Sequence, residues 1–306
     1  MSERVSVIMP SYNTRQYLPE AIDSILAQTM EDFELIVVDN GSTDGSQDYA
    51  RSVSDPRVRV ITERSRGAGH ATNAGITASR ASLLAVMDSD DVAHPDRLKI
   101  QAEYMDAHPD VVLLGAGFRF LVGAAIVSPP RQPQDHDQIR RAILDGRPAM
   151  HNPSTMFRKD AAFAIGGHHF PGPGADCDFF LRMSDVGKLH NLPDVLQFYR
   201  LHDQMTTVVR VLEVNRILAY GVACAKARVE GRSEPSVAEF DKEWSQRSFL
   251  PKARARADCR ASALYRRAIR LRAEGKWLRA AVVTAPAALL SPNRTLWHIK
   301  RQLRLV

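Results

Sequence analysis

Five apolar residues, Leu83 to Met87, run directly into the acidic sequence Asp88-Ser89-Asp90-Asp91. An apolar run of this length that ends in a polar turn predicts a buried parallel strand, with the carboxylates at its C-terminal end. Ligands of open α/β sheets bind at that edge, where an Asp-x-Asp pair can hold a hard divalent cation and leave coordination positions for diphosphate oxygens. Taken alone, the stretch is explained more simply as a solvated turn that opens the next helix.

The elements around this stretch decide between the two explanations. Strands are predicted to alternate with helices from residue 4 to residue 114, which favours a doubly wound parallel sheet. The expected strands are residues 4–9, 34–39, 58–62, 83–87 and 111–114, and the expected helices are residues 18–30, 47–52, 95–107 and one that ends at Ser79. Asp39, Asp88 and Asp90 then lie along one sheet edge, which a shared ligand explains better than independent turns do.

Two other patterns in this half are rejected as ligand motifs. The loop after Asp39 resembles a calcium loop, but Asp44 stands where the required Gly belongs. Gly67-Ala68-Gly69 resembles a dinucleotide-binding turn, but it follows the third strand instead of the first and its third Gly is misplaced.

Composition and charge indicate a globular protein with an unusual C-terminal end. The chain has 306 residues and a net charge of +6, yet residues 251–306 carry 14 Lys and Arg against 2 Asp and Glu. Such a region could meet an anionic membrane, pack on the body of the protein or form an oligomer interface. Nucleic-acid binding is disfavoured because the region's aromatic residues are sparse. The three cysteines, Cys177, Cys224 and Cys259, are predicted to be reduced thiols.

The second half of the chain carries another set of polar residues. Residues 118–127 suit antiparallel strands, and the apolar residues after Asp178 predict a buried helix that has Asp176 and Asp178 at its N-terminus. The helix dipole favours carboxylates there; one of the two can be a cap, so the other needs another role. From about residue 208 only helices are predicted.

These stretches, in their order and spacing, resemble the nucleotide-sugar-dependent glycosyltransferases of family 2. The resemblance covers roughly residues 4–205 and is carried by residues 7–13, 37–44, 73–75, 87–91, 176–182, 191–193 and 199–202. It implies an α/β fold of the GT-A type, a Rossmann-like, mostly parallel sheet flanked by helices, with a helical C-terminal extension. Residues 1–207 would be the catalytic domain, with a nucleotide-sugar half (1–117) and an acceptor half (118–207), and 208–306 a basic helical region.

The resemblance also assigns roles on the donor side. Asp90 would bind Mg²⁺ or Mn²⁺, Asp88 would lie near the ribose or the metal, and Arg66 could assist as a cation. The donor, expected to be a UDP-sugar, would be held by residues of the matching motifs and their neighbours, with Asp39 at the base: Pro10, Tyr12, Asn13, Asp39, Arg66, Asn73, Asp88, Ser89 and Asp90.

On the acceptor side, Asp176 matches the family's catalytic base, which contributes about 10²–10⁴ in rate. The family usually has Glu immediately before this Asp, where this chain has Ala175; Asp178 is the alternative base and an acceptor contact. His202 matches a third metal ligand in some relatives, although a lone His is more often an ordinary residue. The remaining acceptor-side candidates are His151 and Ser154.

The resulting prediction is an inverting, metal-dependent enzyme that transfers one sugar to a saccharide or lipid-linked acceptor in surface polysaccharide or glycolipid assembly. No Gln-x-x-Arg-Trp motif of the processive synthases occurs. The chain enters a strand pattern within four residues and has no membrane-spanning apolar run, so a cytoplasmic location is expected, with peripheral attachment to the inner face of the plasma membrane as an option.

Two other functions stay open. The chain could be a non-catalytic nucleotide-sugar-binding protein, since Ala175 replaces the expected Glu. A sugar nucleotidyltransferase is less favoured, because it should carry a Gly-rich, basic loop after its first strand, where this chain has Pro10-Ser11-Tyr12-Asn13.

Overall fold

The chain divides into two compact units in the computed structural model. The first comprises Met1–Phe118 and Gln132–Tyr199, and the second Arg119–Arg131 and Arg200–Val306. The structure describes residues 3–123, 125–127, 132–147, 149–172, 174–202, 211–246, 257, 260–261, 264–265, 267–272 and 275–290.

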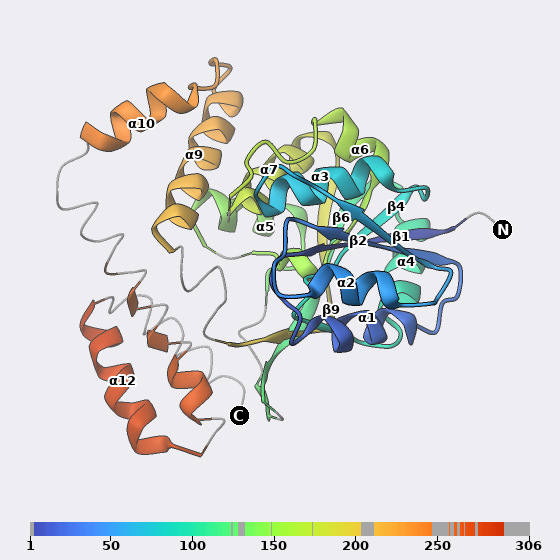
Figure 1. Ribbon diagram of the computed structural model, residues 1–306. Helices are drawn as coiled ribbons and strands as arrows, with labels where there is room; N and C mark the ends of the chain where they lie inside the picture. Colours follow the sequence, from blue (N-terminus) through green and yellow to red (C-terminus); the bar gives the residue numbers. More distant parts are fainter. Residues whose placement is uncertain are drawn as a thin grey trace. The chain divides into compact units, whose positions relative to one another are not determined.

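A nine-stranded sheet runs through the chain in the order β3-β2-β1-β4-β8-β6-β9-β5, with β7 paired to β6 (Figure 1). Its first four strands in this order are parallel: β1 (Val5–Ser11), β2 (Phe33–Asp39), β3 (Val58–Thr62) and β4 (Leu83–Val86). Ser11 lies opposite Asp39 and Ile8 opposite Val86, so the carboxyl ends of these strands share one edge. The predicted α/β fold class is confirmed.

The two faces of the parallel strands are covered by different helices (Figure 1). On β1, Val7 belongs to the hydrophobic cluster that contains Leu18 and Ile22, whereas Ile8 meets Gly75 on the opposite face. Burial of both faces explains why β1, β2 and β4 consist mostly of apolar residues. The helices that follow the first strands are α1 (Leu18–Leu26), α2 (Ser46–Ser52), α3 (Ala68–Ala78) and α4 (Arg97–Ala107).

The other half of the sheet pairs antiparallel. β8 joins β4 to β6, and β5 pairs with β9. Phe120 lies opposite Val127, so the antiparallel strands predicted for residues 118–127 are confirmed. The strands are β5 (Val92–Ala93), β6 (Val111–Val122), β7 (Ala125–Val127), β8 (Met156–Arg158) and β9 (Lys188–Arg200). Between them lie α5 (His136–Leu144), the short helix η1 (Asn152–Ser154), α6 (Lys159–Ala164) and α7 (Ala175–Val186).

The second unit contains the C-terminal helices that the sequence predicts. They include α9 (Val211–Val229), α10 (Val237–Gln246) and α12 (Trp277–Leu290). Phe240 of α10 packs edge-on against Tyr220 of α9, with ring centroids 5.1 Å apart. In the described parts of the chain, no helix combines the length and the apolar character that a membrane span requires.

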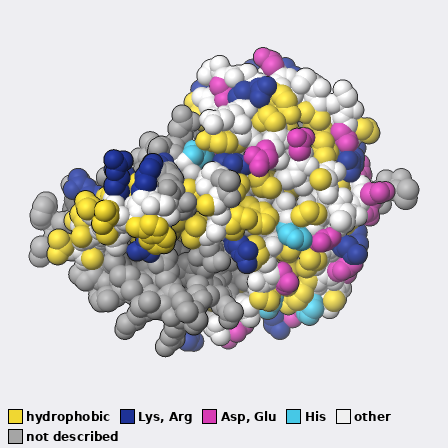
Figure 2. All heavy atoms as spheres, turned by 90° about the horizontal axis from the view of Figure 1, so that it is seen from below, with side chains coloured by type: hydrophobic (Ala, Val, Ile, Leu, Met, Phe, Trp, Pro, Cys, Tyr) yellow, Lys and Arg dark blue, Asp and Glu magenta, His cyan; other side chains and the backbone are white. Residues whose placement is uncertain are grey.

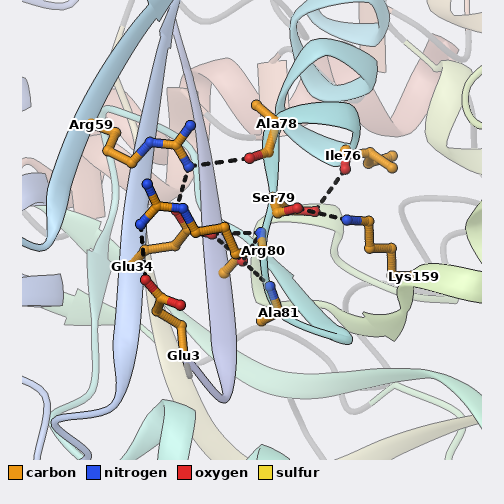
Figure 3. Close-up of polar contacts among 10 residues, drawn as sticks. Glu3, Glu34, Arg59, Ile76, Ala78, Ser79, Arg80, Ala81 and Lys159 are labelled. Atoms are coloured by element: carbon orange, nitrogen blue, oxygen red, sulfur yellow. Dashed lines mark hydrogen bonds and ion pairs between the residues drawn. The ribbon is translucent and has the colours of Figure 1, made fainter. Parts of the chain in front are cut away.

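A buried carboxylate ties the amino ends of the strands together (Figure 3). Glu34, whose side chain is 2% exposed, accepts hydrogen bonds from Ser6 Oγ and from the backbone N–H of Arg80, both at 2.7 Å. Its second oxygen pairs with Arg59 at 2.6 Å. Glu34 thereby fastens the turn between α3 and β4 at the sheet edge opposite the acidic turn, since Ser6 and Glu34 face each other near the strand starts.

We expect Glu34→Ala to lower the free energy of unfolding by about 3 kcal/mol, because it removes the acceptor of the buried Ser6 hydroxyl, the shorter of the two hydrogen bonds of the Arg80 N–H, and the carboxylate partner of Arg59. Urea denaturation measures this loss, and Glu103→Ala, which removes an exposed carboxylate from α4, is the matched control. A loss no larger than that of the control would show that the cluster contributes little.

Candidate active site

Three carboxylates from two parts of the chain come together beyond the carboxyl end of β4. Asp88 and Asp90 follow β4 as expected, and Asp176 stands in the first turn of α7. Burial raises the pKa of Asp88 to about 8, and the neighbouring charges of Asp90 and Asp176 add to the rise. The crowding of these acids thus disfavours their joint ionisation in the metal-free protein, and a divalent cation fits such a set of hard oxygen donors. In the described ranges, no group of three His, Cys, Asp or Glu side chains is arranged around a metal position.

A fully buried arginine, which is not among the predicted site residues, lies behind the acidic turn. Arg97, the first residue of α4, is 0% exposed. Its guanidinium donates to Gln101 Oε1 at 3.0 Å, to Gln197 Oε1 at 2.9 Å, and to the Val86 and Thr155 carbonyls at 2.7 and 3.2 Å. These bonds tie the carboxyl end of β4 to α4 and β9.

The same network reaches the fully buried carboxylate of Asp91. Gln197 Nε2 donates to Asp91 Oδ2 at 3.1 Å, so one glutamine connects Arg97 to Asp91. The positive charge of Arg97 opposes the rise in the pKa of Asp88. Burial lowers the pKa of Arg97, the charges of Asp91 and Asp88 oppose this fall, and the resulting pKa is about 10. Arg97 is thus a fixed internal counter-charge for the acidic turn.

Ser89 and the end of β1 are joined by a chain of hydroxyl groups. Thr14 Oγ1 lies 2.9 Å from Ser89 Oγ and 3.1 Å from Ser11 Oγ. Ser89 is only 3% exposed, so its hydroxyl holds the acidic turn to β1, the strand that carries Pro10. We therefore give Ser89 a positioning role instead of the donor contact predicted from the sequence.

Asp39 and Asn13 shape the loop after β2. Asp39 is 2% exposed and accepts hydrogen bonds from the N–H groups of Gly41 at 3.1 Å and Ser42 at 3.3 Å. Asn13 has a positive φ of 53° and accepts from the N–H of Thr43 at 2.8 Å. The loop that would meet a nucleotide base is therefore built on the side chains of these two predicted donor residues.

Tyr12 and Arg66 lie against each other at the carboxyl edge. The guanidinium carbon of Arg66 is 4.6 Å from the centroid of the Tyr12 ring, which is a cation–π geometry. Asn40 holds the segment that carries Arg66: its Nδ2 donates to the carbonyls of Glu63 and Ser65 at 3.0 and 2.8 Å, and its Oδ1 accepts from Gly67 N at 2.7 Å. The tyrosine is 48% exposed, so the pair is accessible to a ligand.

The glycines after Arg66 are explained by a close backbone contact and not by a dinucleotide. A Cβ on Gly67 would come within 2.4 Å of the Pro171 carbonyl oxygen, and one on Gly69 within 2.0 Å of the Phe170 carbonyl oxygen. Gly69 N donates to the Pro171 carbonyl at 3.3 Å, so the start of α3 packs directly on the segment that leads to Asp176.

Asn73 makes the second contact with that segment. Its Nδ2 donates to the His168 carbonyl and its Oδ1 accepts from the His168 N–H, both at 2.8 Å. Because both ends of the amide are used, we infer that Asn73 positions the segment before Asp176 instead of contacting the donor.

Asn73→Ala should lower kcat about tenfold and leave the Kd of the donor nearly unchanged, because both lost bonds hold the segment before Asp176, the predicted base. The control on the same helix is Thr77→Ala, which removes an exposed side chain. Steady-state kinetics and donor titration measure the two effects. A selective loss of donor affinity in Asn73→Ala would instead support the donor contact predicted from the sequence.

The two acids of α7 have different surroundings. Asp178 is 2% exposed and accepts from Arg182 Nε at 2.9 Å, and Arg182 also donates to the Ile165 carbonyl at 2.6 Å. Asp178 is thus part of an internal ion pair, which argues against its use as a base or acceptor contact. Asp176 is half-buried, and burial raises its pKa, a direction that suits a general base near neutral pH. Gly174, with a φ of 90°, occupies the N-cap, so neither acid caps the helix.

The predicted acceptor residues differ in their access. Ser154 is 0% exposed and its hydroxyl is bonded to the carbonyls of His151 and Ala116, so it supports the backbone and is not available to an acceptor. The His151 ring stacks on Phe118 at 4.2 Å and meets Tyr199 edge-on at 4.6 Å. Burial lowers the pKa of His151 to about 3, so the ring is neutral at pH 7 and can offer contact but not a charge.

His202 belongs to the second unit, whereas Asp88 and Asp90 belong to the first. Its role as a metal ligand stays a prediction. Cys177 and Cys224 are free thiols, as expected, and Cys259 lies outside the described residues.

Comparison with solved structures agrees with this fold. The chain is similar to the mannosyltransferase PcManGT from Pyrobaculum calidifontis in complex with GDP-Man and Mn²⁺, with a TM-score of 0.59, 21% identity and coverage of 99% of this chain and 85% of that chain. It is also similar to S. aureus TarS 1–349 in complex with UDP-GlcNAc, with a TM-score of 0.59, 16% identity and coverage of 96% and 92%.

Sequence comparison identifies the family. The chain is 32% identical over 213 residues to the O-antigen biosynthesis glycosyltransferase WbnJ of Escherichia coli, which covers 67% of this chain and 82% of that protein. The sequence model described as "Glycosyl transferase family 2" matches residues 6–165. The chain belongs to glycosyltransferase family 2.

Proposed function

We propose that this glycosyltransferase moves one sugar, with inversion, from a nucleotide-sugar donor to a hydroxyl group of a saccharide or lipid-linked acceptor. The observation that carries the proposal is the meeting of Asp88 and Asp90 with Asp176 at the carboxyl edge of the parallel strands. The first two fit a cation and a diphosphate, and the third fits a base for the acceptor.

We assign a different role to each residue of the site. Tyr12 and the loop built on Asp39 would hold the nucleoside, and Arg66 would meet the diphosphate. A Mg²⁺ or Mn²⁺ ion held by Asp90 and Asp88 would neutralise negative charge on the diphosphate as the nucleoside diphosphate leaves. Asp176 would accept the proton of the acceptor hydroxyl group. A single in-line displacement needs one such base and no enzyme nucleophile, and it inverts the anomeric centre.

Relatives suggest the substrate classes. WbnJ is named for O-antigen biosynthesis, which supports an acceptor in cell-surface polysaccharide or glycolipid assembly. TarS was solved with UDP-GlcNAc and PcManGT with GDP-Man and Mn²⁺, which supports a nucleoside diphosphate sugar as donor and a divalent metal ion as cofactor. We retain a UDP-sugar as the first donor to test.

We further propose that residues 1–207 form the catalytic domain, with a donor half (1–117) and an acceptor half (118–207), and that 208–306 form an accessory region. The enzyme would work in the cytoplasm, peripherally on the inner face of the plasma membrane. The excess of basic residues in 251–306 supports the membrane part of this proposal.

A thermal-shift screen against UDP-, GDP-, dTDP- and CMP-sugars, each with and without Mn²⁺, tests the donor and the metal together. A ligand that binds only the folded state raises Tm by mass action, so one nucleotide should give a shift that needs Mn²⁺. A shift of the same size without Mn²⁺ would contradict metal dependence. No shift with any donor would contradict nucleotide-sugar binding by the free enzyme.

A further inference from the structure

Helix α12 is apolar on two faces, although one face suffices for packing on its own unit. Ala280 and Ala287 are fully buried on the inner face. Three large apolar side chains lie on the outer face with exposed fractions of 87%, 72% and 84%: Leu278, Val282 and Leu289. Their spacing of four and seven residues places them in one stripe. An exposed apolar stripe of this kind marks an interaction surface.

A groove between residues 267–272 and α12 includes two residues of this stripe, Leu278 and Val282. Its volume is about 440 Å³, and its lining residues are Leu271, Leu278, Val282 and Val283 together with Arg267 and Arg279. The groove therefore offers mainly apolar contact, and two of its residues, Arg267 and Arg279, are exposed cations; a phospholipid acyl chain and its phosphate group require this combination.

The charge around the groove selects an anionic occupant. Residues 260–290 contain seven Lys and Arg against one acid, Glu274. At the left of Figure 2, hydrophobic side chains lie side by side with Lys and Arg side chains, and no acidic side chain of the described residues is seen among them. Trp277, which is 66% exposed, begins the helix next to Lys276, and this pairing is typical of the interface between water and lipid.

The length of α12 distinguishes a helix that spans a membrane from one that lies on its surface. α12 has 14 residues, whereas a span needs about 20. An apolar stripe beside basic residues on such a helix fits one that lies in the plane of the membrane surface.

We propose that α12 and the adjoining groove are a docking surface for an anionic phospholipid membrane, with the stripe Leu278, Val282 and Leu289 entering the acyl region and Arg267 and Arg279 contacting phosphate groups. The proposal rests on the proposed peripheral location and adds the surface and the lipid chemistry responsible for it. It uses no step of the transfer reaction.

Vesicle flotation of the full-length protein tests the proposal. Wild type should float with phosphatidylcholine vesicles that contain phosphatidylglycerol, weakly with pure phosphatidylcholine, and less as salt rises. The double variant Leu278→Glu/Val282→Glu should bind the anionic vesicles at least about tenfold more weakly. The control Val229→Glu adds a charge at a 66% exposed apolar position of α9 and should bind as wild type does.

A second variant, Arg267→Glu/Arg279→Glu, changes only exposed charges and covers the case in which the first variant does not fold. Binding of either folded variant at the wild-type level would overturn the proposal. Wild-type protein that does not bind anionic vesicles would also overturn it. A third contradicting result is a wild-type dimer in light scattering that becomes a monomer in the first variant, because α12 would then be a dimer interface.

Sugar transfer to a soluble acceptor, measured without vesicles, distinguishes this proposal from the proposed enzymatic function. If the docking proposal is wrong, this transfer should still occur. If the proposed reaction is wrong, the protein should still bind vesicles.

Discussion

Asp176→Asn is expected to lower the transfer rate about 10²–10⁴-fold while the donor still binds. Asparagine keeps the size of the side chain and its place in the first turn of α7, but it cannot accept a proton from the acceptor hydroxyl group. Because the donor contacts proposed here come from other side chains, the thermal shift with donor and Mn²⁺ should persist. The loss should therefore appear in kcat and not in donor affinity.

The pH dependence of the wild type gives a second readout for Asp176. Burial raises the pKa of this carboxyl group, and only the deprotonated form can act as a base. The rate should therefore rise with pH through that raised pKa, and the rise should be absent from the residual activity of Asp176→Asn. The control is Asp137→Asn, which removes an exposed carboxylate from α5. Wild-type kcat in Asp176→Asn would remove this residue from the mechanism.

The parallel half of the fold could be predicted because its strands carry their own signal. β1, β2 and β4 are buried on both faces, so each consists mostly of apolar residues and is followed by polar residues. β8 and β9 could not be found in this way. β8 has three residues, and β9 contains Pro193 and several polar residues, so both depend on pairing with distant strands.

In the candidate site, too, some residues could be predicted from the sequence and others could not. Asp88, Asp90 and Asp176 were predicted because strand ends, a helix start and the family motifs mark them. Arg97 looks like any residue of a helix, and its partner Gln197 is 100 residues away in the chain.

Two other predicted site residues have polar atoms that already have partners. Asn73 and Ser154 were assigned to substrates, but their polar atoms bond to backbone groups of the fold itself, which favours a positioning role. Sequence shows which residue types are present, but it does not show which polar atoms the fold has already used.

Asp88→Asn should have opposite effects on the stability of the metal-free protein and on its function. The pKa of Asp88 is about 8 in the folded protein, against about 3.9 in an unfolded chain. Between these two pKa values the folded state keeps a proton that the unfolded state releases. The contribution of protonated Asp88 to the free energy of unfolding is therefore complete below about pH 4 and is lost as pH rises towards 8. Asparagine does not titrate, so the variant should gain on wild type across this range, by an amount on the order of a few kcal/mol at pH 8.

The same substitution should remove the response to metal and donor, because one of the two carboxylates proposed to hold the cation is gone. Thermal melts of both proteins at pH 5 and pH 8, with and without Mn²⁺ and donor, measure both effects in one experiment. A difference in Tm that stays constant with pH would show that the pKa of Asp88 is not raised, and a full metal-dependent shift in the variant would remove Asp88 from the metal site. If both expectations hold, the crowding of Asp88, Asp90 and Asp176 that creates a site for a cation also destabilises the fold when no metal is bound.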